Sequence, residues 1–176
     1  MKKHVISVLL MLALALSLCA CGKTELRPAP DAGEPERTLS FETTDLAGNA
    51  VSSADLFAAH DYTLVNIWAS WCGPCVGELP ELQKIAAEYA AKNCAVVGIL
   101  IDSTDPGGVE SAQELLSQAG ADYPVLCVPE NFDSQMSVQA VPTSVIVDSE
   151  GKIVTDEIVG ADPDGYRAAF DALLDN

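Results

Sequence analysis

Two cysteines separated by two residues are the part of this sequence best suited to chemistry. They lie in the segment Trp71–Cys75, which reads Trp-Cys-Gly-Pro-Cys and follows the apolar, β-prone run Thr63–Ala69. We expect a strand, a tight turn and a helix that begins at Cys72, where free backbone N–H groups and the helix dipole would stabilise a thiolate. The thiolate is the reactive form of cysteine, and Cys75 lies one helical turn further on, where it can close a disulfide. The motif therefore predicts thiol–disulfide exchange.

A Cys-X-X-Cys pair is also half of a zinc site, and this is the main alternative interpretation. A zinc site would need two further Cys or His ligands at suitable spacing. His4 lies in the N-terminal leader and His60 is the only other histidine. Cys94 and Cys127 are isolated cysteines in apolar runs; we expect buried free thiols, with a bridge between them as the alternative. The sequence thus favours redox chemistry by the cysteines themselves, with no metal and no other cofactor.

Motifs further along the chain extend the pattern around the cysteines. They are Trp68–Cys75, Glu78, Pro80, Leu82, Tyr123–Leu126, Val141–Thr143 and Gly160. In order and spacing, the region from Leu39 to Leu174 resembles the thioredoxin superfamily, and specifically the membrane-anchored TlpA/ResA-type thiol-disulfide oxidoreductases. The resemblance implies an α/β, thioredoxin-like three-layer fold, in which helices flank a mixed central sheet, with an N-terminal hairpin and a central insertion.

The same resemblance implies a substrate-binding surface beside the cysteines. Val141 and Pro142 are similar to the cis-proline loop of the superfamily, which leaves the backbone of Val141 free to pair with an extended peptide. Trp71, Gly73 and Pro74 would shape the surface that such a peptide approaches. The alternative for Pro142 is an ordinary trans X-Pro bond in a turn.

One residue departs from the pattern of cytoplasmic thioredoxins, which carry a buried aspartate in the strand before the motif. This chain has Asn66 there, and an amide cannot accept a proton from the resolving thiol. Glu78 lies three residues after Cys75, on the same face of the expected helix, and is the candidate for proton transfer. The resemblance also implies an active-site glutamate at this position. The alternative is a solvated helix glutamate with no partner.

The N-terminus predicts export. Lys2 and Lys3 precede the apolar run Val5–Leu18, as in a secretory signal, and the run is shorter than the roughly 20 residues of a membrane span. The residues that follow resemble a bacterial lipobox with cleavage before Cys21, which would carry the lipid. An uncleaved anchor is the alternative. Either way we expect an extracytoplasmic domain, lipid-anchored to the cell membrane.

We therefore divide the chain into a lipoprotein signal peptide (1–20), a flexible tether (21–38) and a thioredoxin-like domain (39–176). The tether has several prolines and no apolar periodicity, so it should be extended. The formal net charge is −17, which argues against nucleic acid and anionic lipid as partners and favours neutral or basic substrates.

Hydrophobic periodicity predicts alternating strands and helices within the domain. The expected elements are a hairpin of 40–45 with 50–51, strand Thr63–Ala69, helix Cys72–Lys92 kinked at Pro80, strand Ala95–Ile101, helix Gly107–Gly120, strand Pro124–Val128, helix Asn131–Val138, a hairpin of Thr143–Val147 with Ile153–Ile158, and helix Pro163–Leu174. The apolar stripe of the first helix comprises Val76, Leu79, Leu82, Ala86 and Tyr89.

These features predict a monomeric protein-disulfide reductase, in which Cys72 attacks the substrate disulfide, Cys75 resolves the mixed disulfide and Glu78 assists proton transfer. The resemblance implies electrons from a CcdA/DsbD-type membrane thiol transporter. It also implies oxidised exported proteins as substrates, such as apocytochrome c or methionine sulfoxide reductase. A disulfide-forming oxidase is the alternative with the same chemistry, although Gly73 and Pro74 resemble the reducing thioredoxins.

Alternatives from other classes fit the residues less well. A peroxiredoxin would have threonine three residues before its reactive cysteine, where this chain has Ala69. A copper chaperone of the Sco type would need Cys-X3-Cys and a downstream histidine, and none follows His60. A non-catalytic binding lipoprotein is the remaining alternative.

Overall fold

A five-stranded mixed sheet forms the centre of the domain, in the strand order β5-β4-β3-β6-β7. The computed structural model describes residues 37–175. Strands β3 and β5 both run parallel to β4, whereas β6 runs antiparallel to β3 and to β7. The strands are β3 (Tyr62–Trp68), β4 (Cys94–Leu100), β5 (Val125–Cys127), β6 (Thr143–Asp148) and β7 (Ile158–Val159). The central position of β3 explains why its residues after Tyr62 are all buried.

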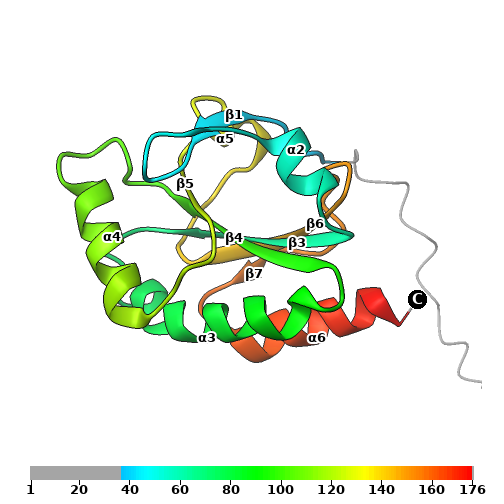
Figure 1. Ribbon diagram of the computed structural model, residues 1–176. Coiled ribbons are helices and arrows are strands. Elements are labelled where there is room, and N and C mark those ends of the chain that lie inside the picture. Colours follow the sequence, from blue (N-terminus) through cyan, green and yellow to red (C-terminus); the bar gives the residue numbers. More distant parts are fainter. Residues whose placement is uncertain (1–36, 176) are drawn as a thin grey trace, which may run out of the picture. The chain divides into compact units, whose positions relative to one another are not determined.

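Helices and a small hairpin cover the two faces of this sheet (Figure 1). One face packs against α3 (Gly73–Ala90), α4 (Gly108–Ala119) and α6 (Pro163–Leu174). The other face carries β1 (Glu42–Thr44), β2 (Ala50–Ser52), α2 (Ser53–Ala58) and α5 (Phe132–Gln135). Two separate hydrophobic clusters fill the layers above and below the sheet. The predicted thioredoxin-like three-layer fold is confirmed.

Helix α3 begins directly after Cys72 and continues through Pro80 to Ala90, as the sequence predicted. Its buried face comprises Cys75, Glu78, Leu79, Leu82, Ile85 and Tyr89. The predicted stripe was wrong at Val76 and Ala86, which are only partly buried. Ile85 lies in the core instead, so the true stripe is rotated towards Cys75 and Glu78.

Three elements differ from the expectation. The predicted helix Asn131–Val138 is reduced to the single turn α5, because the backbone is already extended at Met136. The predicted strand Ile153–Ile158 is reduced to β7, with an isolated bridge between Val147 and Ile153. The Thr155 hydroxyl accepts the N–H of Ile146 at 3.0 Å, so a side chain replaces a backbone partner there. Helix α2 was not predicted, because its short run has too few turns to show helical periodicity.

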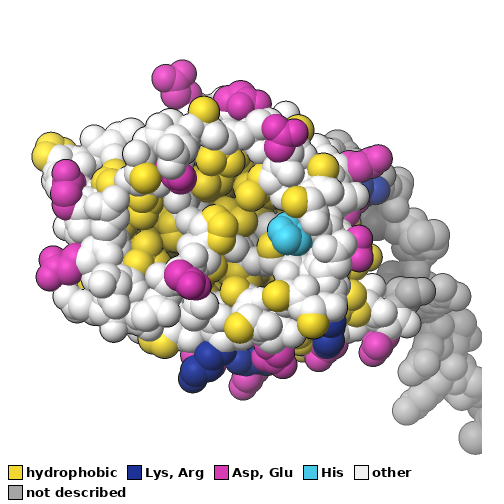
Figure 2. Space-filling model, viewed as in Figure 1, with side chains coloured by type: hydrophobic (Ala, Val, Ile, Leu, Met, Phe, Trp, Pro, Cys, Tyr) yellow, Lys and Arg dark blue, Asp and Glu magenta, His cyan; other side chains and the backbone are white. Residues whose placement is uncertain are grey.

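The sheet is open on one side at the start of β4. Within β4, only Gly98–Leu100 pair with β5, and within residues 37–175 no strand pairs with the outer edge of Cys94–Val97. An apolar hollow lies there between α2, α3 and the β5 side of the sheet, and Figure 2 shows apolar side chains gathered on this face. Thr38 and Arg37, at the end of the predicted tether, already contact the sheet through Lys152 and Ile153.

Candidate active site

The cysteine pair lies where β3 passes into α3. Cys72 is the N-cap residue of α3, and its Sγ accepts the backbone N–H of Cys75 at 3.3 Å. The N–H of Cys72 donates to the carbonyl of Ala69 at 3.1 Å, which closes the turn between strand and helix. The Cys72 sulfur therefore lies at the positive end of the helix dipole, where a thiolate is stabilised.

Cys72 and Cys75 form a disulfide with an S–S length of 2.05 Å and a Cα–Cα distance of 5.3 Å. Cys72 keeps 5% of its surface exposed, whereas Cys75 is fully buried. An external sulfur can therefore reach Cys72 more easily than Cys75. Gly73 and Pro74, between them, are exposed.

The turn before Cys72 is held by an aspartate from the loop that follows the neighbouring strand. The carboxylate of Asp102, just after β4, accepts the N–H of Ser70 at 3.1 Å and its hydroxyl at 2.5 Å. Asp102 is buried. Gly108 packs so closely on the backbone of Asp102 that a Cβ at position 108 would overlap the Asp102 carbonyl oxygen. This contact was not predicted, because nothing in the sequence spacing of Ser70 and Asp102 links them.

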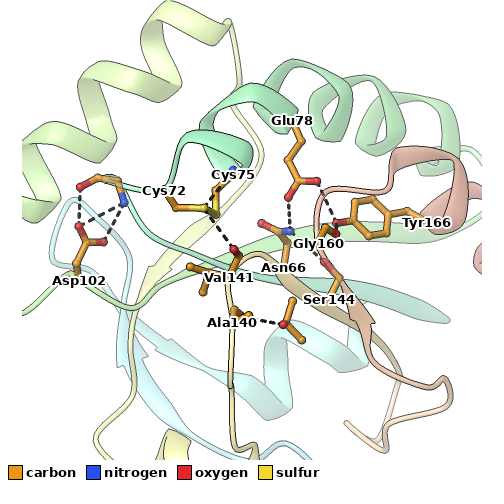
Figure 3. The surroundings of a disulfide bond; sticks show 12 residues. Asn66, Cys72, Cys75, Glu78, Asp102, Ala140, Val141, Ser144, Gly160 and Tyr166 are labelled. Carbon is orange, nitrogen blue, oxygen red and sulfur yellow. Dashed lines mark hydrogen bonds between the residues drawn. A yellow bond between two sulfur atoms is a disulfide. The ribbon is translucent and has the colours of Figure 1, made fainter.

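The loop before β6 faces the disulfide, as the resemblance implied (Figure 3). The Val141–Pro142 bond is cis, and the Val141 carbonyl oxygen lies 3.5 Å from Cys72 Sγ. The N–H of Gly160 donates to the Pro142 carbonyl at 2.8 Å, and the Thr143 hydroxyl donates to Ala140 at 2.8 Å. These bonds fix the loop against the cysteines.

Glu78 lies one turn after Cys75 and is 3% exposed, so the solvated alternative is wrong. Its Oε1 accepts an N–H of Asn66 at 2.9 Å, and its Oε2 lies 3.0 Å from the Tyr166 hydroxyl (Figure 3). Burial raises the pKa of Glu78 to about 7, and the charge of Asp162 adds to this, while the two hydrogen bonds lower it. Glu78 can thus gain or lose a proton near neutral pH.

Tyr166, in α6, is suited to both protonation states of Glu78. Its hydroxyl lies 3.0 Å from Glu78 Oε2 and 3.2 Å from the Gly160 carbonyl oxygen. Burial raises the pKa of Tyr166 to about 12, so the hydroxyl keeps its single proton. It can donate to ionised Glu78, or donate to Gly160 and accept from protonated Glu78. Tyr166 was not predicted as a site residue, because it lies far from the cysteines in the sequence.

A groove of about 690 Å³ opens beside the cysteines, between Trp71 and Val141. Trp71 is 67% exposed at the rim of this groove, whereas Trp68 is fully buried in the core. The groove has apolar walls that include Phe132, with Glu130 among its acidic lining residues.

Several predictions from the sequence concern the rest of the chain. Cys21 and the leader lie outside the described residues. Cys94 and Cys127 are free thiols, but only Cys94 is buried; Cys127 is partly exposed at the end of β5. No group of three or more His, Cys, Asp or Glu residues within 37–175 is arranged to hold a metal ion. In that same range, we find no helix with the length and apolar character needed to cross a membrane.

The fold and the disulfide at the start of α3 define a thioredoxin-like protein. The model of the Redoxin family matches residues 27–174, and the chain belongs to this family. It is 28% identical over 122 residues to the thiol-disulfide oxidoreductase ResA of Bacillus thuringiensis (strain Al Hakam), covering 69% of this chain and 66% of that protein.

A second relative and a solved structure show similarity in sequence and in fold, respectively. The thiol:disulfide interchange protein DsbE of Allochromatium vinosum is 35% identical over 126 residues, which cover 70% of this chain and 58% of DsbE. The chain thus spans slightly less than two thirds of the length of ResA and less than three fifths of the length of DsbE. The crystal structure of a thiol:disulfide interchange protein from Chlorobium tepidum TLS superposes with a TM-score of 0.67 at 23% identity, covering 81% of this chain and 98% of that one.

Proposed function

We propose that this protein is an extracytoplasmic thiol-disulfide oxidoreductase that works as a protein-disulfide reductase. The observation that carries the proposal is the Cys72–Cys75 disulfide at the N-terminus of α3, with the buried Glu78 one turn further along the same helix. The relatives named ResA and DsbE support the class of reaction.

The reaction begins with the reduced pair. The Cys72 thiolate attacks one sulfur of a substrate disulfide, forms a mixed disulfide and releases the other substrate sulfur as a thiolate. Cys75 then loses its proton, with Glu78 as the accepting base, and attacks the Cys72 sulfur. The second substrate thiolate leaves, so the substrate has gained two electrons and the protein holds the disulfide again.

Substrate contacts would come from the surface around Cys72. An extended peptide would pair with the backbone of Val141, beside Pro142, while Trp71, Gly73 and Pro74 limit what can approach. The exposure of Trp71 and the closeness of the Val141 carbonyl to Cys72 support these roles.

The direction of electron flow and the partners are part of the same proposal. We infer that a lipid on Cys21 attaches the protein to the cell membrane. A CcdA/DsbD-type membrane thiol transporter would supply the electrons. The substrates would be oxidised exported proteins, and apocytochrome c and methionine sulfoxide reductase are the first classes to test. The chain would act as a monomer. Replacing Cys21 with serine should release the protein from the membrane fraction, and unchanged membrane attachment would overturn the lipid assignment.

The deciding experiment is the reduction potential of the Cys72/Cys75 couple, measured by equilibration with glutathione and dithiothreitol buffers. A potential of about −250 mV or lower supports a reductase, whereas about −120 mV would indicate an oxidase. The Cys72→Ala variant is the control, because it should lose all turnover. A chain with no reversible two-electron couple would be a binding protein.

A further inference from the structure

We propose that Asn66 is a positioning residue for the redox couple: its side-chain oxygen accepts a hydrogen bond from the Cys75 thiol in the reduced protein, while its amide group holds Glu78. The proposal rests on the proposed function, because it concerns the reduced form of the Cys72/Cys75 pair. From the sequence, Asn66 was expected only to be unable to take up a proton.

The amide nitrogen of Asn66 has a fixed set of partners. Asn66 lies in the central strand β3 and is fully buried. Its Nδ2 donates to Glu78 Oε1 at 2.9 Å and to Ser144 Oγ at 3.0 Å. Both amide protons are therefore used, and the side-chain oxygen must point away from Glu78 and Ser144.

That oxygen is left without a partner. Within residues 37–175, Asn66 Oδ1 is among the few buried side-chain atoms that make no hydrogen bond. A buried acceptor that is not paired costs free energy, and such atoms in native proteins usually have a specific reason. The oxidised protein therefore carries an unused acceptor in its core.

The acceptor faces the cysteines. Side chains alternate along a strand, so Asn66 shares the face of β3 that carries Leu64 and Trp68, and these pack in the same cluster as Cys75. In Figure 3 the Asn66 amide lies between the disulfide and the Glu78 carboxylate, with its oxygen on the side of the cysteines.

Reduction gives Cys75 an S–H group that requires a hydrogen-bond acceptor. In the disulfide its sulfur has no proton to donate. When the S–S bond takes up two electrons and two protons, Cys75 gains an S–H group at a position with no exposed surface. Asn66 Oδ1 then becomes its acceptor, so reduction pairs two buried groups and stabilises the dithiol relative to the disulfide.

The two ends of the Asn66 side chain thus serve two partners. The oxygen orients the Cys75 thiol and the nitrogen orients the Glu78 carboxylate, which takes the proton when Cys75 attacks the mixed disulfide. Because an amide does not titrate, Asn66 leaves the proton to Glu78. An apolar residue of similar shape at this position should make the couple more strongly reducing.

The test compares Asn66→Leu with Thr63→Val in the full chain, with the four other cysteines replaced by serine. The Thr63 hydroxyl is also buried and unpaired, but it lies on the opposite face of β3, so Thr63→Val controls for removing such an atom. We expect Asn66→Leu to shift the equilibrium with glutathione about five- to tenfold towards the disulfide, the effect of about one net hydrogen bond. Thr63→Val should leave it unchanged.

An Asn66→Leu equilibrium equal to that of the wild type, or an equal shift in both variants, would overturn the inference. Absence of a reversible couple in the wild type would instead overturn the proposed function. A second measurement avoids changing Asn66 and therefore does not depend on how that variant folds. In a Cys72→Ser variant that keeps Cys75 as its one cysteine, the infrared S–H stretch should lie at the lower frequency of a hydrogen-bonded thiol. A free-thiol frequency would also overturn the inference.

Discussion

The Tyr166 hydroxyl lies 3.0 Å from Oε2 of Glu78, although the two residues are 88 positions apart in the sequence. Glu78 belongs to α3, which starts at the disulfide, and Tyr166 belongs to α6, the last helix of the domain. The C-terminal helix therefore contributes directly to the surroundings of the proposed proton acceptor.

Replacing Tyr166 with phenylalanine tests that contribution. The hydrogen bond from Tyr166 lowers the pKa of Glu78, so its loss should raise that pKa above about 7. We expect the inflection in the pH profile of substrate reduction to move to higher pH, and the free energy of unfolding to fall by about 1 kcal/mol. An unchanged profile would show that Tyr166 is only a packing residue.

Glu78 should also make stability depend on pH. Its pKa is about 7 in the folded protein against an ordinary value of 4.5, so between these pH values the folded state binds more protons than the unfolded chain. The free energy of unfolding should therefore fall as pH rises from about 4.5 to 7, by on the order of 3 kcal/mol.

The Glu78→Gln variant should lose this dependence, and substrate reduction should slow by about 100-fold because no base remains. Urea unfolding at a series of pH values measures the slope. Glu110→Gln, an exposed residue of α4, is the matched control and should unfold like the wild type. A Glu78→Gln protein that keeps the slope would mean that another group titrates.

The contact between Asp102 and Ser70 should stabilise the turn that presents Cys72. Asp102→Ala leaves the N–H and hydroxyl of Ser70 without their acceptor, at a cost of about 1–3 kcal/mol of unfolding free energy. Asp105→Ala, an exposed residue of the same loop, should change it by less than about 0.5 kcal/mol. Equal effects of the two substitutions would rule out a specific role for Asp102.

Trp71 should matter for substrate and not for folding. Because its side chain is 67% exposed, Trp71→Ala should change the free energy of unfolding by no more than about 0.5 kcal/mol. Loss of an aromatic contact should raise KM for a protein disulfide about tenfold. Steady-state kinetics separate this result from a fall in kcat at unchanged KM, which would contradict a binding role.

Local sequence signals were sufficient for the elements that position the cysteines. The helix start at Cys72 was predicted from the strand and turn around the cysteines. The continuation through Pro80 and the last helix, Pro163–Leu174, were predicted from hydrophobic periodicity. Strand β3 follows from its apolar run. These features depend on neighbours in the chain, which a sequence displays.

The contacts that tune the site could not be predicted in the same way. Tyr166 and Asp102 reach the site only because the fold brings separate elements together, and no spacing in the sequence links them to Glu78 or Ser70. Burial of Glu78 was likewise hidden, because a glutamate on a helix is usually exposed. Asn66 could be recognised as unusual, but its partners required the structure.

The register of the sheet keeps one of the spare thiols away from the electron exchange. Cys94 pairs with Tyr62 at the start of β3, whereas the cysteine pair follows the opposite end of that strand. At about 3.3 Å per residue, the length of β3 separates them by roughly 20 Å. Cys94 therefore cannot exchange disulfides with Cys72 or Cys75 in the folded protein. Each catalytic cycle would then form one disulfide, between these two cysteines.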